Sequence, residues 1–133
     1  MTKFLKPMII ISVLTGTKDI PSQDQKVNFE KNLTHVVYFW LSNPDKTEDR
    51  KAFETSLRKF MDNSQYAQTK FIGIPAETPR DVVDNSYTYS LILSFPSKEI
   101  QEKYQKEPAH LLFVEESSQL WERVQVYDSV GID

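Results

Sequence analysis

The chain contains no cysteine and only three glycines in its 133 residues. Without cysteine there is no thiol nucleophile, no thiolate metal ligand and no disulfide framework, and the compartment stays open because a cysteine-free chain suits either redox state. A chain of this length buries about two-thirds of the surface that its unfolded state exposes, so its core can support it without cross-links. We therefore expect one globular domain.

The sequence also lacks a field of positive charge. Sixteen Lys and Arg stand against 19 Asp and Glu, the net charge is −3, and no basic stripe occurs. Proteins that bind nucleic acids normally concentrate Lys and Arg to displace counterions from phosphates. We therefore expect no nucleic-acid partner.

The apolar run Met8–Leu14 is too short to be a permanent membrane span, which needs about 20 residues. Lys3 and Lys6 precede the run and Thr15-Gly16-Thr17 follows it, an order that resembles a short bacterial signal peptide. An uncleaved terminal arm or an extra strand of β-branched residues fits the same pattern. A working leader would place the protein in the cell envelope or periplasm, and otherwise it would be cytoplasmic.

Residues 18–31 are polar and are expected to form a linker, so residues 1–32 are a leader-like segment with its linker and residues 33–133 are the folded domain. Within that domain, runs of β-branched and aromatic residues predict strands. These strands cover residues 33–41, 71–75, 87–95 and 121–130.

Helices are expected between these strands. Asp45 is the predicted cap of the first, whose apolar face carries Phe53, Leu57, Phe60 and Met61. Ser97 is the predicted cap of a short helix with Ile100 and Tyr104, and Pro108 ends it and opens a further helix over residues 109–117. The order is that of an α+β, ferredoxin-like split βαβ fold, a four-stranded antiparallel sheet with helices on one face.

The first strand predicts a partner, because both of its faces are apolar or aromatic. His35, Val37, Phe39 and Leu41 point to one side, and Val36, Tyr38 and Trp40 point to the other. Helices on one face of the sheet leave the other face exposed to solvent. We therefore expect Val36, Tyr38 and Trp40 to form a homodimer interface. Partly exposed aromatic residues on a monomer are the alternative.

Three segments resemble the stress-responsive α/β-barrel (Dabb) family. They are Tyr104-Gln105-Lys106-Glu107-Pro108-Ala109-His110-Leu111-Leu112-Phe113-Val114-Glu115, Thr34-His35-Val36-Val37, and Leu120-Trp121-Glu122-Arg123 with Val126-Tyr127-Asp128. They occur in the family's order over residues 33–130. The resemblance implies a ferredoxin-like monomer, a dimeric α/β barrel and a cavity between helices and sheet.

The family's plant polyketide cyclases close a ring by aldol chemistry without a cofactor, and the resemblance carries their catalytic residues over to His35, Tyr104 and His110. An imidazole can take a proton from carbon flanked by carbonyls, and a phenol can orient it or stabilise the enolate. Val37, Phe39, Phe53 and Leu57 would line the pocket for a small apolar or carbonyl-containing ligand. Leu57 departs from the cyclases, which carry a tyrosine there, so the polar contact of that tyrosine is missing from this chain.

Two classes of function remain open. In the first, the chain is a small-molecule pocket protein with cofactor-free acid/base chemistry. In the second, it is a non-catalytic stress-response or interaction module in which His35, Tyr104 and His110 only hold the fold, since buried polar groups are usually satisfied structurally. We expect no metal site, because the two histidines form no close-spaced ligand pattern.

Overall fold

The computed structural model describes residues 32–132. The sequence predictions for a leader and a linker therefore lie outside the described residues. From the first strand, β1, to the last, β4, the strands and helices follow the predicted order. The elements are β1 (Leu33–Leu41), α2 (Thr47–Asn63), β2 (Gln68–Gly73), β3 (Tyr89–Phe95), α3 (Lys98–Lys106), α4 (Pro108–Ser117), a short 3-10 helix (Ser118–Leu120) and β4 (Trp121–Val130).

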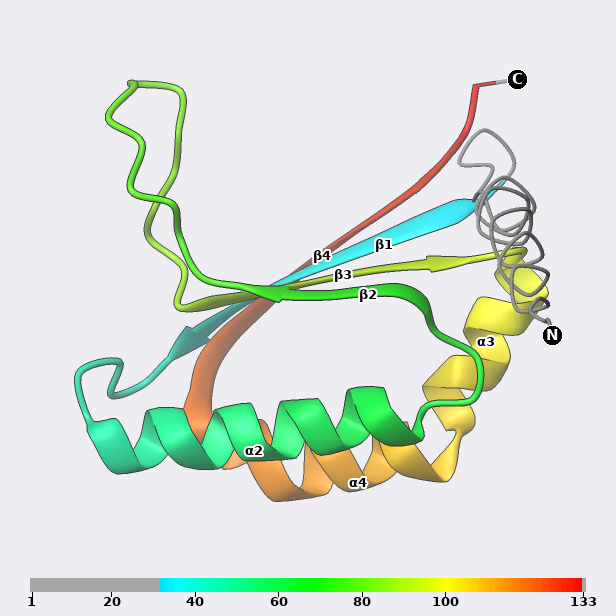
Figure 1. Ribbon diagram of the computed structural model, residues 1–133, viewed down its shortest axis with the longest axis horizontal. Coiled ribbons are helices and arrows are strands. Elements are labelled where there is room, and N and C mark those ends of the chain that lie inside the picture. Colours follow the sequence, from blue (N-terminus) through cyan, green and yellow to red (C-terminus); the bar gives the residue numbers. More distant parts are fainter. Residues whose placement is uncertain (1–31, 133) are drawn as a thin grey trace, which may run out of the picture.

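The strands form one antiparallel sheet in the order β2-β3-β1-β4. The helices α2 and α4 lie side by side on one face of this sheet, and α3 lies beyond its end (Figure 1). The predicted fold class is confirmed. β1 and β3 are the central strands, so their inner-face residues form the middle of the core.

The core fills the space between the sheet and the two covering helices. The odd-numbered residues of β1 are buried and the even-numbered ones are half-buried, as the alternation of a strand predicts. The helix α2 buries the four apolar residues of its predicted face, Phe53, Leu57, Phe60 and Met61. Burying this apolar surface is the main source of stability.

The start of α2 corrects one prediction. The helix begins at Thr47, with Lys46 at the cap position and no side-chain cap hydrogen bond, so Asp45 does not cap it. Glu48 and Asp49 lie in the first turn, where negative charge is favoured by the helix dipole. Their charge therefore stabilises this end of the helix in the absence of a side-chain cap.

Three other boundaries differ from those predicted. The strand β2 runs from Gln68 to Gly73 and omits Ile74 and Pro75, β3 starts at Tyr89, and α4 already begins at Pro108. The shift of β2 includes a register irregularity before Phe71, where Thr69 has a positive φ of 50°. The polar residue Gln68 joins the sheet through backbone pairing with Ser94, which hydrophobicity does not reveal.

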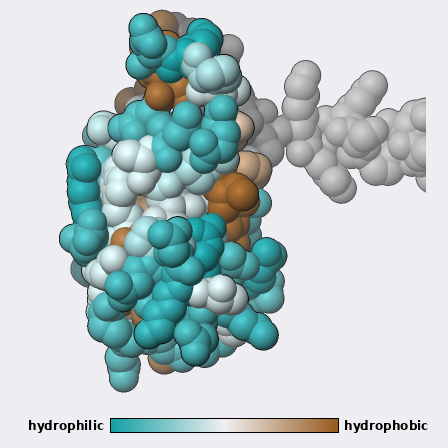
Figure 2. Space-filling view, turned by 90° about the vertical axis from the view of Figure 1, so that its left-hand side faces the viewer, coloured by the Kyte–Doolittle hydropathy of each residue, from teal (hydrophilic) through white to brown (hydrophobic). Residues whose placement is uncertain are grey.

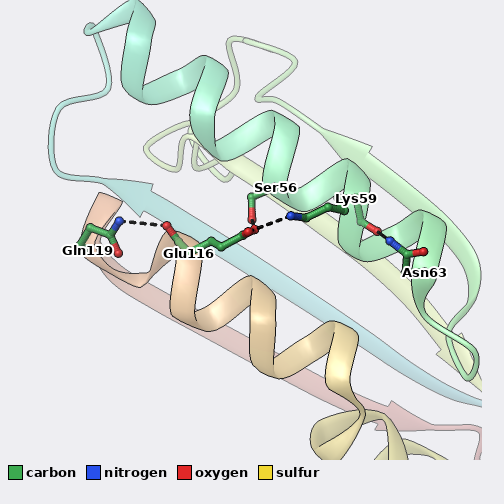
Figure 3. A network of polar contacts seen from close by, with 5 residues as sticks. All are labelled: Ser56, Lys59, Asn63, Glu116 and Gln119. Atoms are coloured by element: carbon green, nitrogen blue, oxygen red, sulfur yellow. Dashed lines mark hydrogen bonds and ion pairs between the residues drawn. The ribbon is translucent and has the colours of Figure 1, made fainter.

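A polar network joins α2 to α4 on the side away from the sheet (Figure 3). The Glu116 carboxylate accepts hydrogen bonds from Ser56 Oγ at 2.9 Å and from Lys59 Nζ at 2.8 Å. The Lys59–Glu116 pair is partly exposed, so its contribution to stability is small. Its structural value is that it fixes which side of α4 faces α2.

The outer face of the sheet carries no helix of the described chain (Figure 1). Strand register places Val36, Ile92 and Tyr127 in one row across it, and Tyr38 lies one row further along β1. The next outward-facing residue of β1 is Trp40, which has the Arg123 guanidinium 4.1 Å above its ring. The predicted interface residues Val36, Tyr38 and Trp40 thus share one half-buried, mostly aromatic surface.

Candidate functional site

Three side chains that the sequence singled out lie together between the sheet and the helices. His35 comes from the inner face of β1, Tyr104 from α3 and His110 from the first turn of α4. The Tyr104 ring centroid is 5.6 Å from that of His35 and 5.3 Å from that of His110. The structure therefore brings the three residues into one cluster, with Tyr104 next to both histidines.

The junction between α3 and α4 sets the position of Tyr104 and His110. Ser97 Oγ accepts a hydrogen bond from the Ile100 backbone N–H at 3.2 Å and so caps α3 as predicted. Glu107 lies between the two helices, and its buried carboxylate accepts hydrogen bonds from Ser64 Oγ at 2.6 Å and the Gln65 N–H at 3.0 Å. This anchor ties the junction to the end of α2.

Asp128 on β4 is a member of the cluster that was not among the predicted site residues. Its Oδ1 lies 2.6 Å from His35 Nδ1, and the two residues are register partners in the β1–β4 ladder. A carboxylate at this distance accepts the Nδ1 proton, so a neutral His35 keeps its lone pair on Nε2. Asp128 stands within one of the segments that carry the family resemblance, but the strand register that pairs it with His35 is not visible in the sequence.

The cluster is buried at its centre and open at the edge of the sheet. His35 and Tyr104 are 4% and 2% exposed, whereas the Asp128 side chain is 44% exposed. The strand β4 is an edge strand, and its inward-facing Val126 and Val130, on either side of Asp128, are exposed as well. The Asp128 carboxylate is therefore the part of the cluster that solvent reaches.

Burial controls the protonation of Tyr104 and His110. Burial of the Tyr104 hydroxyl raises its pKa most, and the negative charges of Glu107 and Asp128 raise it further. Tyr104 therefore remains a neutral phenol. Burial lowers the pKa of His110, with the Gln105 backbone and Glu107 acting in the opposite direction. Both groups are thus uncharged near pH 7.

His110 has an unused polar atom. Its Nδ1 is buried and has no hydrogen-bond partner among residues 32–132. Such an atom costs free energy unless it finds a partner. It could donate to or accept from a ligand that enters beside Tyr104.

The four predicted pocket residues lie in the core beside the cluster. Val37 and Phe39 are buried on β1, and Phe53 and Leu57 are buried on α2. The rings of Phe39 and Phe53 are 5.0 Å apart, and both contact Phe113 and Trp121. In this conformation they pack against protein, and their role as a ligand lining stays a prediction.

The cluster contains the groups needed for proton transfer. A carboxylate orients one imidazole, a phenol can donate a hydrogen bond, and a second imidazole is neutral. Within the described part of the chain, no group of three or more His, Asp or Glu side chains is arranged to hold a metal ion. No helix in that part is both long and apolar enough to cross a membrane.

Comparisons with known proteins agree with this architecture. The similar solved structures include a Dabb family protein with a ferredoxin-like fold from Mesorhizobium loti, with 17% identity, 77% of this chain and 98% of that chain covered, and a TM-score of 0.64. A dimeric protein of unknown function with a ferredoxin-like fold from Bacteroides fragilis has 14% identity, coverage of 77% and 99%, and a TM-score of 0.61. The hydroxynitrile lyase of Passiflora edulis has 12% identity, coverage of 76% and 94%, and a TM-score of 0.62.

At these identities the structural relatives show the fold alone. No curated protein matches the chain. The model of the Stress responsive A/B Barrel Domain matches residues 33–130, which is most of the chain. The chain therefore belongs to the Dabb, or stress-responsive A/B barrel, family.

Proposed function

We propose that this protein is a homodimeric enzyme that catalyses proton transfer on small carbonyl compounds without a cofactor, with His35 as the base. The observation that carries the proposal is the 2.6 Å contact between His35 Nδ1 and Asp128 Oδ1 beside the Tyr104 ring. Asp128 is the positioning residue, since its carboxylate holds the tautomer in which Nε2 can accept a proton.

The reaction class follows from these groups. His35 Nε2 takes a proton from a carbon between two carbonyl groups, and the electron pair of the C–H bond moves to a carbonyl oxygen to form an enolate. The Tyr104 hydroxyl stabilises that oxygen by donating a hydrogen bond. When the enolate carbon attacks a second carbonyl of the same molecule, a C–C bond forms and the new alkoxide takes the proton back from the imidazolium. No oxidant, reductant or metal is required.

Two further facts support an enzyme of this kind. One structural relative is a hydroxynitrile lyase, so the fold accommodates an active site. The unpartnered His110 Nδ1 provides a polar contact for a ligand next to Tyr104. The ligand we infer is small and apolar apart from its carbonyl groups, because aromatic and aliphatic side chains surround the cluster.

We also infer that two chains pack through the outer faces of their sheets. Val36, Tyr38 and Trp40 lie on this face, and the described helices cover only the other one. Relatives from Bacteroides fragilis and Thermobifida fusca are described as dimeric. A two-fold dimer would bury this aromatic surface and form the α/β barrel of the family.

A second function is favoured by the packing of the same cluster. The Tyr104 ring stacks on Phe60 at 5.5 Å and lies 4.8 Å from Phe95, and both it and His35 are almost fully buried. In a non-catalytic interaction module these residues would serve stability alone. The two functions differ in whether the cluster touches a ligand.

The test is the exchange of activated C–H protons of 1,3-dicarbonyl probes in D₂O, followed by NMR. We expect the wild-type protein to accelerate exchange over buffer, and His35→Ala and Asp128→Asn to lose at least about tenfold of that acceleration. Tyr127→Phe is the matched control, because Tyr127 adjoins Asp128 in sequence but faces the other side of the sheet. Exchange at the buffer rate for every probe, or equal rates in wild type and His35→Ala, would contradict the proposal.

A further inference from the structure

The connection between β2 and β3, residues 74–88, is much longer than two adjacent antiparallel strands require, since hairpin loops usually have two to five residues. We call it the arm. The arm rises from the sheet on the side opposite the helices (Figure 1). Figure 2 views the molecule from the end of the sheet where the arm stands. The arm protrudes above the rest of the protein, and its surface contains both hydrophilic and hydrophobic residues.

The base of the arm is fixed to the outer face. Trp40 Nε1 donates to Ser86 Oγ at 3.1 Å, and the Thr88 backbone N–H donates to the Phe39 carbonyl at 2.8 Å. A hollow of about 410 Å³ lies between the arm and the sheet, and Val83 and Asp84 of the arm line it together with Tyr38 and Trp40. The arm therefore borders the same surface that we assign to the dimer.

The arm is ordered by its own contacts. Asn85 Nδ2 donates to the Thr78 carbonyl at 3.2 Å and so links its two limbs, and the Val83 N–H donates to the Arg80 carbonyl at 2.9 Å and closes a turn. Pro75 and Pro79 restrict the backbone further. A segment that is already ordered loses little entropy when it binds.

The outer part of the arm presents an apolar side chain to solvent. Val82 is 82% exposed, and Arg80 and Asp81 beside it are exposed residues of opposite charge. A single exposed valine is ordinary on a protein surface. Here it lies on a rigid projection that stands beside an uncovered aromatic sheet face.

We propose that the arm is a dimerisation element that reaches past the interface and packs Val82 against a second copy of this chain. This inference rests on the outer-face dimer proposed above. Packed sheets lie about 10 Å apart, so a projection that rises above one sheet extends alongside the next. Two-fold symmetry doubles the contact, because each chain receives the partner's arm and contributes its own, and Arg80 and Asp81 can meet opposite charges there.

The absence of native cysteine allows the proposal to be tested on the full chain. The variant Val82→Cys is labelled with benzophenone maleimide and irradiated, and we expect a covalent dimer. The matched control is Leu111→Cys, which is 57% exposed on α4 and therefore on the helix side. Label at this position should give no dimer.

Sedimentation separates the arm from the interface. We expect Val82→Asp to raise the dimer dissociation constant at least about tenfold. We expect Val36→Glu to give monomer, since it places a charge between Ile92 and Tyr127 in the interface without touching the arm's anchor at Trp40. If the wild type is dimeric, the arm's role would be overturned by two results together: Val82→Asp dissociates as the wild type does, and label at position 82 gives no cross-linked dimer. A monomeric wild type would overturn the dimer itself, and neither result bears on the proton-exchange assay.

Discussion

Replacing Tyr104 by phenylalanine removes one hydroxyl from the centre of the cluster and keeps the ring that packs on Phe60 and Phe95. If the hydroxyl stabilises an enolate, the loss falls on catalysis. Removal of one such donor typically costs about 100-fold or more in rate. Because the ring packing is kept, we expect the melting temperature to change by no more than about 2 °C, which corresponds to a few tenths of a kcal/mol for a domain of this size.

A structural role for the hydroxyl predicts the opposite pattern. A buried partner left without its hydrogen bond costs about 1–3 kcal/mol. For a domain of about 100 residues each kcal/mol lowers the melting temperature by roughly 4–8 °C. The two roles therefore differ by several degrees in stability and by two orders of magnitude in exchange rate.

The matched control is Tyr89→Phe, another buried tyrosine whose hydroxyl donates to Glu54 Oε2 at 2.5 Å. Its ring stacks on Phe53 at 4.9 Å, and it pairs with Phe39 on β1, whereas His35 pairs with Leu93 further along the sheet. We expect this variant to lose stability and to keep its exchange rate. The assays are thermal unfolding by circular dichroism and probe exchange by NMR. A Tyr104→Phe variant that melts several degrees lower and exchanges the probe at the wild-type rate would refute the catalytic role.

Three other outcomes follow from the same contacts. Glu107→Ala leaves Ser64 Oγ and the Gln65 N–H without their acceptor, so urea unfolding should show a loss of about 2–3 kcal/mol, and an unchanged midpoint would disprove the anchor. The pKa of His110 is lowered in the folded state, so below about pH 6.5 the unfolded chain binds a proton that the folded chain resists, and stability should fall as pH falls. Melting temperatures of His110→Gln should show a weaker decline between pH 7 and pH 5, and an identical decline would assign it to other groups. Asp128→Asn should slow probe exchange with little change in the melting temperature, because Asp128 is half-exposed, and an unaffected rate would remove its positioning role.

The sequence predicts this fold well because each strand and helix has its own hydrophobic pattern. The alternation along β1 places His35 and Val37 on the buried face, and the helical spacing of Phe53 and Leu57 places both in the core. Boundaries are less predictable, since the polar Gln68 belongs to β2 through backbone pairing with Ser94 of β3. The cap position of α2 is Lys46, whose N–H donates to the Asn43 carbonyl at 3.0 Å, and this backbone turn is not visible in the residue types.

Part of the candidate site was also predictable. The family resemblance identifies Tyr104 and His110 in its helical motif and His35 on the first strand. Asp128 could be recognised as a partner of His35 only from the β1–β4 register, which depends on how two strands far apart in the sequence pair. The same holds for the arm, because the hydrogen bonds from Trp40 and Thr88 that fix its base to the sheet join residues far apart in the sequence.

The tautomer of His35 decides whether the cluster holds an oriented base. The protein has two histidines, so an NMR spectrum that correlates ring protons with the nitrogens of ¹⁵N-labelled histidine is simple, and His110→Gln assigns it. When His35 is neutral, we expect a proton on Nδ1, held by Asp128, and a lone pair on Nε2. A neutral His35 with its proton on Nε2 would contradict the proposed function, because the cluster would then hold no oriented base.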